Sequence, residues 1–243
     1  MITGKADIVA QLQKEIFALQ GFKKNACNPR LDDALGPIKQ AFPNKQFPLG
    51  AVHEFVFGSV EDAAATGGFV SGLLAHLMSS GGACLWISSS RNIFPPALKA
   101  FGIEPDKIIF IDLNRDKQIA WALEEALKCT SLAAVVAEIS ELSFIASRRL
   151  QLAVEQSQVT GFLLRRNPRN LATTACVTRW HIKSLAGITP GNVPGVGFPS
   201  WQVELSKIRN GKPGSWAVQF VGNKFRFLTS TPAAIPMPQK KTG

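Results

Sequence analysis

Tyrosine is absent from this chain of 243 residues, and cysteine and histidine are scarce, with four and three copies. The cysteines form no C-x-x-C pair and stand at least 45 residues apart, at Cys27, Cys84, Cys129 and Cys176. This spacing favours reduced thiols in the core of a cytoplasmic protein over a disulfide framework or a zinc site. The histidines show no metal-ligand spacing either, so the sequence predicts no metal site.

Long apolar runs are also missing. The longest, such as residues 83–87 and 132–137, fall far short of the roughly 20 residues that a membrane-spanning helix needs. Residues 8–19 are mixed rather than apolar, so we expect no secretory signal, no membrane contact and a cytoplasmic location. A hydrophobic content of 46% with 18% charged residues is typical of a globular protein with a sizeable core.

Acidic residues almost disappear from the last hundred residues. Residues 1–143 carry 13 Lys and Arg against 15 Asp and Glu, whereas residues 144–243 carry 14 against 2. The net charge of +10 therefore comes from the C-terminal part of the chain. Such a field attracts polyanions, nucleic acid above all, or an acidic protein surface; a basic face that serves only solubility is the alternative.

Apolar periodicity divides the chain into three parts. Near the N-terminus, apolar residues recur at helical spacing, at Ile8, Leu12, Ile16 and Leu19. An amphipathic helix set apart in this way has to dock on its own domain or on a partner. Residues 1–46 are thus predicted to be a helix with a proline-containing polar linker, residues 47–229 the core, and residues 230–243 a disordered tail.

Short apolar strands alternate with helical segments through the first part of the predicted core. This alternation predicts β-α-β units and a mainly parallel sheet flanked by helices. From residue 175 onward the pattern predicts strands alone, at residues 175–183, 201–207 and 216–227. The predicted fold class is therefore α/β, with a parallel core, a C-terminal antiparallel extension and an N-terminal helix.

A small-residue stretch at residues 58–68 follows the first strand, where a nucleotide-binding α/β protein has its phosphate loop. A working G-x-x-x-x-G-K-[ST] loop needs a lysine for the outer phosphates and a hydroxyl for magnesium. This stretch has no lysine, and its two carboxylates would repel a triphosphate. The residues of this degenerate site are Gly58, Glu61, Asp62, Gly67, Gly68 and Glu138. Glu138 ends a later strand, at the position where an ATPase would hold magnesium. Because the lysine is missing, we interpret Glu138 as structural or vestigial. We predict no catalysis and no cofactor.

Arginines of the basic half are the candidate contacts to nucleic acid. They are Arg148, Arg149, Arg165, Arg166, Arg169 and Arg179. Three of them follow the strand at residues 161–164, at the carboxyl end of the sheet, where open α/β proteins bind ligands. For the pair on the preceding helix, internal ion pairing to Glu141 or Glu155 is the alternative. Stacking platforms are scarce, with Trp180 and Trp201 as candidates.

Several separated motifs resemble the bacterial ImuA family, a RecA-like branch of the DNA-damage (SOS) response. Residues 121–129 read W-A-L-E-E-A-L-K-C, and residues 146–153 read A-S-R-R-L-Q-L-A. Residues 201–216 contain W-Q-V-E-L and R-N-G-K-P-G-S-W, similar to the closing hairpin of that family. The resemblance covers roughly residues 47–228, with the motifs in the family's order.

The resemblance implies a RecA-like core and an accessory role in damage-induced, error-prone translesion synthesis. It implies two partners: ImuB, an inactive relative of the Y-family polymerases, and an error-prone C-family DNA polymerase. RecA and single-stranded DNA are further candidate partners. The segment with Ile8, Leu12, Ile16 and Leu19 stands where RecA has its neighbour-docking helix, which makes it the candidate partner-binding segment.

Three functions remain open at the level of sequence. The first is a non-catalytic scaffold of translesion synthesis with possible DNA contact, because the lysine and hydroxyl of the RecA phosphate loop are missing. The second is a DNA-dependent ATPase that uses a variant loop with Glu138. The third is a simple module for single-stranded DNA, carried by the arginines after the strand at residues 161–164.

Overall fold

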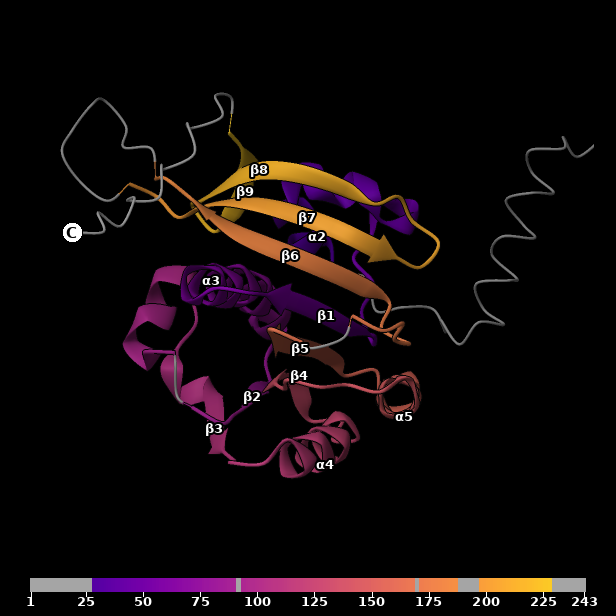
Figure 1. Ribbon diagram of the computed structural model, residues 1–243. Coiled ribbons are helices and arrows are strands. Elements are labelled where there is room, and N and C mark those ends of the chain that lie inside the picture. Colours follow the sequence, from indigo (N-terminus) through magenta and orange to yellow (C-terminus); the bar gives the residue numbers. More distant parts are fainter. Residues whose placement is uncertain (1–27, 91–92, 169–170, 188–196, 229–243) are drawn as a thin grey trace, which may run out of the picture.

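The strands of the described chain form one mixed sheet, in the order β3-β2-β4-β5-β1-β6-β7-β8-β9 (Figure 1). The computed structural model describes residues 28–90, 93–168, 171–187 and 197–228. The strands are β1 (Val52–Phe57), β2 (Ala83–Ser88), β3 (Ile108–Asp112), β4 (Leu132–Glu138), β5 (Thr160–Arg166), β6 (Thr178–Leu185), β7 (Ser200–Ile208), β8 (Gly214–Val221) and β9 (Lys224–Phe227). The α-helices are α2 (Pro29–Ala34), α3 (Val60–Leu77), α4 (Asp116–Leu127) and α5 (Phe144–Ser157). The 3₁₀ helices are η1 (Gly36–Ala41), η2 (Pro43–Lys45), η3 (Met78–Ser80), η4 (Pro95–Phe101) and η5 (Pro105–Lys107).

The sheet changes from parallel to antiparallel at β6. Among the described strands, β1 to β6 pair in parallel, with β1 between β5 and β6. β7, β8 and β9 then continue from β6 in antiparallel order. This arrangement confirms the predicted α/β class, with a mainly parallel core, flanking helices and a C-terminal antiparallel extension.

Helices cover both faces of the parallel part of the sheet (Figure 1). α3 packs on one face, and α4 and α5 pack together on the other. Side chains alternate between the two sides, so that Phe55 of β1 joins the cluster beneath α3 and Val52 joins the cluster beneath α4 and α5. Every residue of β1 is buried, as expected for a strand covered on both faces. In Figure 1, α4 and α5 stop short of β7, β8 and β9, so neither of these two helices covers that side of the extension.

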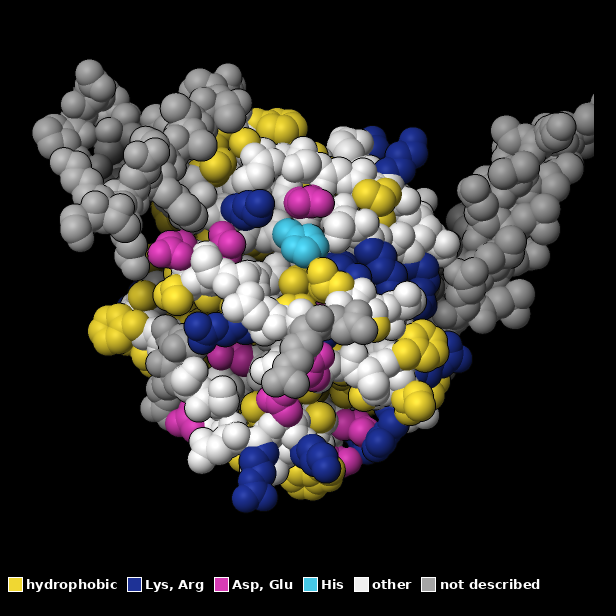
Figure 2. Space-filling model, in the orientation of Figure 1, with side chains coloured by type: hydrophobic (Ala, Val, Ile, Leu, Met, Phe, Trp, Pro, Cys, Tyr) yellow, Lys and Arg dark blue, Asp and Glu magenta, His cyan; other side chains and the backbone are white. Residues whose placement is uncertain are grey.

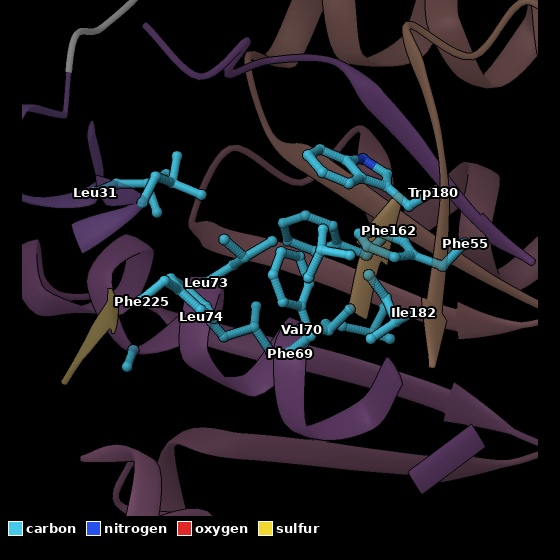
Figure 3. Packing of buried hydrophobic residues seen from close by; sticks show 14 of the residues in the cluster. Leu31, Phe55, Phe69, Val70, Leu73, Leu74, Phe162, Trp180, Ile182 and Phe225 are labelled. Atoms are coloured by element: carbon cyan, nitrogen blue, oxygen red, sulfur yellow. The ribbon is translucent and has the colours of Figure 1, made fainter. Parts of the chain in front are cut away.

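The cluster beneath α3 brings together rings from distant parts of the chain. The ring of Phe69 lies 5.8 Å from that of Trp180 and 4.8 Å from that of Phe225, measured between centroids. Figure 3 shows Leu31 and Phe225 close to the stretch of α3 that carries Leu73. The antiparallel extension is therefore part of the same core as the parallel sheet.

The described part of the predicted linker is not a linker. Leu31, Leu35, Ile38 and Phe42 are buried in the cluster beneath α3. Three of the four prolines that suggested a linker, Pro29, Pro37 and Pro43, stand in the first turn of α2, η1 and η2, where a missing backbone N–H breaks no helical hydrogen bond. The core therefore begins before residue 47, and the domain boundary predicted from the prolines is wrong.

The strand predicted at residues 216–227 is a hairpin of two strands. Val221 pairs with Lys224 across a link of two residues, Gly222 and Asn223. Both have positive φ, 57° and 62°, as a tight hairpin turn requires. The Gly-Asn pair was the signal for this turn, and the apolar residues on either side obscured it.

The predicted N-terminal helix with Ile8, Leu12, Ile16 and Leu19 lies outside the described residues, as does the tail at residues 230–243. Within the described ranges, no helix combines the length and the apolar character needed to cross a membrane.

Candidate functional site

The link from β1 to α3 is the first place where function was predicted. β1 ends at Phe57 and α3 begins at Val60, so only Gly58 and Ser59 connect them. The predicted loop at residues 58–68 is therefore wrong beyond its first two residues. A phosphate loop needs several residues whose backbone amides surround the phosphates, and a link of two residues cannot form that cradle.

The start of α3 is satisfied by its own residues. The Ser59 hydroxyl accepts a hydrogen bond from the backbone N–H of Asp62 at 3.0 Å. Glu61 and Asp62 lie in the first turn, where carboxylates balance the positive end of the helix dipole. Hydrogen bonding to its own backbone N–H, and then to Ser59, lowers the pKa of Glu61. The backbone N–H groups of Glu61 and Asp62, which in a nucleotide-binding protein could bind a phosphate, are thus already hydrogen-bonded to side chains of this segment.

The glycines of α3 serve close packing rather than phosphate binding. A Cβ atom on Gly68 would lie 3.0 Å from Cζ2 of Trp201 and 3.3 Å from Cζ of Phe101. A Cβ atom on Gly72 would lie 2.8 Å from Cζ of Phe225. These positions let the helix approach the aromatic rings beneath it, which explains the small-residue pattern that resembled a phosphate loop.

A cleft of about 970 Å³ nevertheless remains at the carboxyl ends of β1, β2, β4 and β5. Its apolar lining includes Val60, Ala64, Phe94, Phe101, Phe198 and Trp201. The ionisable residues of its described lining are Glu61, Asp116, Glu138 and Arg166. Glu138 accepts a hydrogen bond from Nε1 of Trp86 at 3.3 Å, which holds its carboxylate against the sheet. The cleft therefore occupies a ligand-binding position of an α/β fold but has an apolar and acidic lining.

The predicted degenerate site is brought together in part. Glu61, Gly67, Gly68 and Glu138 line the cleft, whereas Gly58 and Asp62 are not among its lining residues. The sequence missed the apolar contribution of η4 and of the residues before β7, because no motif links those segments to the start of α3.

A buried ion-pair network occupies the other corner, after β5. Arg165 is 1% exposed and pairs with Glu54 of β1, which is fully buried. The second oxygen of Glu54 accepts hydrogen bonds from Nε of Arg179 at 2.8 Å and from the Thr174 hydroxyl at 3.0 Å. The prediction that Arg165 contacts nucleic acid is wrong, because its side chain is buried against the carboxylate of Glu54. Arg179 is 15% exposed and engaged in the same network.

This network also fixes the chain that leads into β6. Lys207 of β7 donates to the carbonyl of Thr174 at 2.6 Å, and Arg209 donates to that of Ala175 at 3.1 Å. Ser147 of α5 accepts a hydrogen bond from the backbone N–H of Ala175 at 2.9 Å. Several cations of the basic half therefore hold the fold together.

The other predicted arginines differ in their surroundings. Arg149 pairs with Glu124 of α4 at 2.7 Å. The predicted alternative of an internal ion pair therefore holds for Arg149, but its partner is neither Glu141 nor Glu155. Arg148 is exposed on α5, and Arg166 is exposed and lines the cleft. Arg169 lies outside the described residues.

The proposed stacking platforms are inside the core. Trp180 is fully buried and stacks on Phe55 at 6.0 Å, and Trp201 is 4% exposed. The prediction that these rings stack on bases is wrong, because strand alternation turns them toward α3. Figure 2 shows acidic side chains over the start of α3 and a group of Lys and Arg side chains beyond β6, toward the right.

Comparison with solved structures identifies the class of this protein. The chain is similar in fold to a KaiC-like protein from the archaeon Pyrococcus horikoshii OT3, with a TM-score of 0.52 and 11% identity over 80% of this chain and 96% of the other. The fold is thus a RecA-like α/β fold, with a link of two residues where a nucleotide-binding α/β protein has its phosphate loop.

Comparison with curated proteins identifies the family. No protein-family model matches the chain. Two proteins named ImuA, from two strains of Caulobacter vibrioides, are 34% identical to it over 194 residues, which cover 75% of this chain and 80% of theirs. The chain belongs to the ImuA family, the RecA-like family that the sequence resemblance ties to damage-induced mutagenesis.

Proposed function

We propose that this chain is a non-catalytic accessory protein of damage-induced, error-prone translesion DNA synthesis. In this role it serves as a scaffold for ImuB and an error-prone C-family DNA polymerase. The observation that carries the non-catalytic part is the two-residue link, Gly58 and Ser59, between β1 and α3. An ATPase of this fold class holds its phosphates with a loop of backbone amides and a lysine, and the described lining of the cleft includes no lysine.

Membership of the ImuA family supports the biological part of the proposal, since the sequence resemblance implies both partners. Large apolar side chains on the surface support a scaffold. Phe94, Trp121, Phe144 and Ile145 are each more than half exposed. Exposed aromatic and aliphatic groups of this size favour contacts with other proteins.

The test is a binding assay between the full chain and purified ImuB from the same organism, with and without ATP and single-stranded DNA. We expect binding whose affinity does not change with ATP. Binding that requires ATP would contradict the non-catalytic proposal and would favour the ATPase alternative with Glu138. No binding under any condition would remove the scaffold.

A second candidate function, contact with single-stranded DNA, is favoured by the exposed cations near the end of β5 and on α5. Arg148 and Arg166 are both exposed, unlike Arg165. Reversing both to Glu should weaken binding of a fluorescent oligonucleotide and should lower the slope of log affinity against log salt by about 0.7 for each lost phosphate contact.

The matched control for this test is Lys117→Glu, an exposed cation on α4 in the nearly neutral part of the chain. It should leave both the affinity and the salt slope unchanged. An equal loss in the control and in the double variant would show attraction by net charge alone, without a site.

A further inference from the structure

Three exposed apolar side chains border the cleft beside α3. Val60 is 68% exposed, Phe94 69% and Phe198 41%, and all three line the same cavity of about 970 Å³. Single exposed apolar residues are ordinary on a protein surface, but a group around one concave site is typical of a binding site. The volume lies at the upper end of the range of roughly 300–1,000 Å³ found for ligand pockets.

Small residues on the side of α3 that faces the cleft keep the cleft open. Gly67 lies beneath it, and a Cβ atom there would reach only ordinary contact with Cδ1 of Ile93, at 3.7 Å. Ala64, one turn earlier, is exposed and also lines the cleft. Helix α3 therefore presents a smooth apolar wall to η4, which contributes Ala97 and Phe101, and to Phe94, the residue before η4.

The ionisable lining that the structure describes is acidic. Among the described lining residues, three carboxylates, Glu61, Asp116 and Glu138, stand against one guanidinium, that of Arg166. The lowered pKa of Glu61 keeps this carboxylate charged at neutral pH. A field of this sign repels a nucleoside triphosphate and attracts Lys or Arg side chains.

We propose that this cleft is a docking groove for a peptide segment of a partner protein that combines bulky apolar side chains with Lys or Arg. The apolar side chains enter between α3 and η4, where Ala64 and Phe94 meet them, and the cations face Glu61 and Asp116 at the rim. The inference rests on the proposed function in one respect, because it names the surface by which a scaffold without nucleotide would hold a partner. Charge complementarity to the acidic rim is what identifies the occupant.

The experiment uses the full chain and a display library of random 12-residue peptides. Selection on the native chain is followed by counter-selection on Ala64→Arg, which places bulk and positive charge on an exposed helical position inside the cleft. We expect the enriched peptides to carry aromatic or aliphatic residues beside Lys or Arg. Synthetic copies should bind the native chain in fluorescence anisotropy and should bind Ala64→Arg at least tenfold more weakly.

Two further variants separate charge from shape. Glu61→Arg should weaken the same peptides at least threefold and should make their binding less sensitive to salt. Ala100→Arg is the matched control, because Ala100 is exposed on η4 but is not among the lining residues, and it should bind like the native chain. Circular dichroism and thermal unfolding of each variant exclude a folding defect as the cause.

The other outcomes overturn the inference in distinguishable ways. Enrichment of acidic peptides, or of peptides that bind Ala64→Arg equally well, removes the docking groove and leaves the proposed function intact. Dimers of the chain that dissociate in Ala64→Arg would show that a second copy occupies the cleft. A fluorescent ATP analogue that binds the native chain and not Ala64→Arg would overturn both the inference and the non-catalytic function.

Discussion

Two corners of the sheet, the link from β1 to α3 and the loop after β5, use charge in opposite ways. At the first corner, Glu61 stands exposed in the first turn of α3 and borders an apolar cleft. At the second, Arg165 lies buried against Glu54, and Arg179 completes the network from β6. Three carboxylates of the nearly neutral part of the chain line this cleft, whereas part of the positive charge of the basic half is buried in the fold.

The net charge of a region of this chain therefore differs from the charge that the region offers to a partner. A polyanion is attracted most strongly by cations that keep their contact with solvent, because buried ion pairs present little net field. For the basic half, Arg148 and Arg166 meet that condition and Arg165 does not. The corner at the start of α3 carries fewer charges but borders the cleft of about 970 Å³.

The largest effect is expected from removing the carboxylate of the buried network. Glu54→Ala removes the buried partner of Arg165 and leaves it, among the described carboxylates, only that of the half-exposed Glu141, at 3.8 Å. Breaking a buried ion pair in this way costs roughly 3–5 kcal/mol of the free energy of unfolding. Urea unfolding followed by tryptophan fluorescence measures the loss.

The matched control is Glu204→Ala, which removes an exposed carboxylate from β7 and should change stability by less than about 0.5 kcal/mol. The combination Glu54→Leu with Arg165→Met should recover part of the loss, since an apolar pair of similar volume replaces the ion pair while Arg179 and Thr174 still lose their acceptor. Equal stability of Glu54→Ala and Glu204→Ala would show that the network does not hold this corner together.

The sequence predicted the topology of the parallel core well, because buried parallel strands leave apolar runs and the helices between them leave periodic ones. It could not predict that Arg165 and Glu54, 111 residues apart, face each other, since this depends on β5 lying beside β1. The same limit explains the candidate site. Small residues in α3 looked like a phosphate loop, and only the position of Trp201 and Phe225 showed that they serve helix packing.

A smaller change in the free energy of unfolding is expected from His53, which lies in β1 on the face opposite to Glu54. His53 is fully buried, where its nitrogens contact the Thr178 hydroxyl and the carbonyl of Pro48, each at 2.8 Å. Burial lowers the pKa of His53 from 6.5 to about 3. The unfolded chain therefore binds a proton between pH 6.5 and 3 that the folded chain does not, so this contribution to stability is complete above pH 6.5 and is lost as the pH falls.

Urea unfolding at pH 7 and pH 5 measures this contribution, which should fall by about 2 kcal/mol over the interval. His181, which is half-buried on β6, provides the control. Burial lowers its pKa as well, so His181→Gln should remove only its own share and should retain most of the pH dependence, which His53→Gln should lose. A free energy of unfolding that stays constant from pH 7 to pH 5 would contradict the neutral, buried state of His53.

The smallest change in stability is expected from the glycines of α3. It tests whether the helix is tightly packed both at Gly72, beneath Phe225, and at Gly67, beside the cleft. Gly72→Ala places a Cβ atom 2.8 Å from the ring of Phe225, and the resulting crowding should outweigh the gain in helix propensity and lower the free energy of unfolding by about 1 kcal/mol. Gly67→Ala, five residues earlier, meets only ordinary contact at 3.7 Å and should raise it by up to about 1 kcal/mol. Thermal unfolding of the two variants should therefore shift in opposite directions. A loss in both would mean that the cleft wall is as tightly packed as the core, and the open groove beside α3 would then be too rigid to admit a peptide side chain.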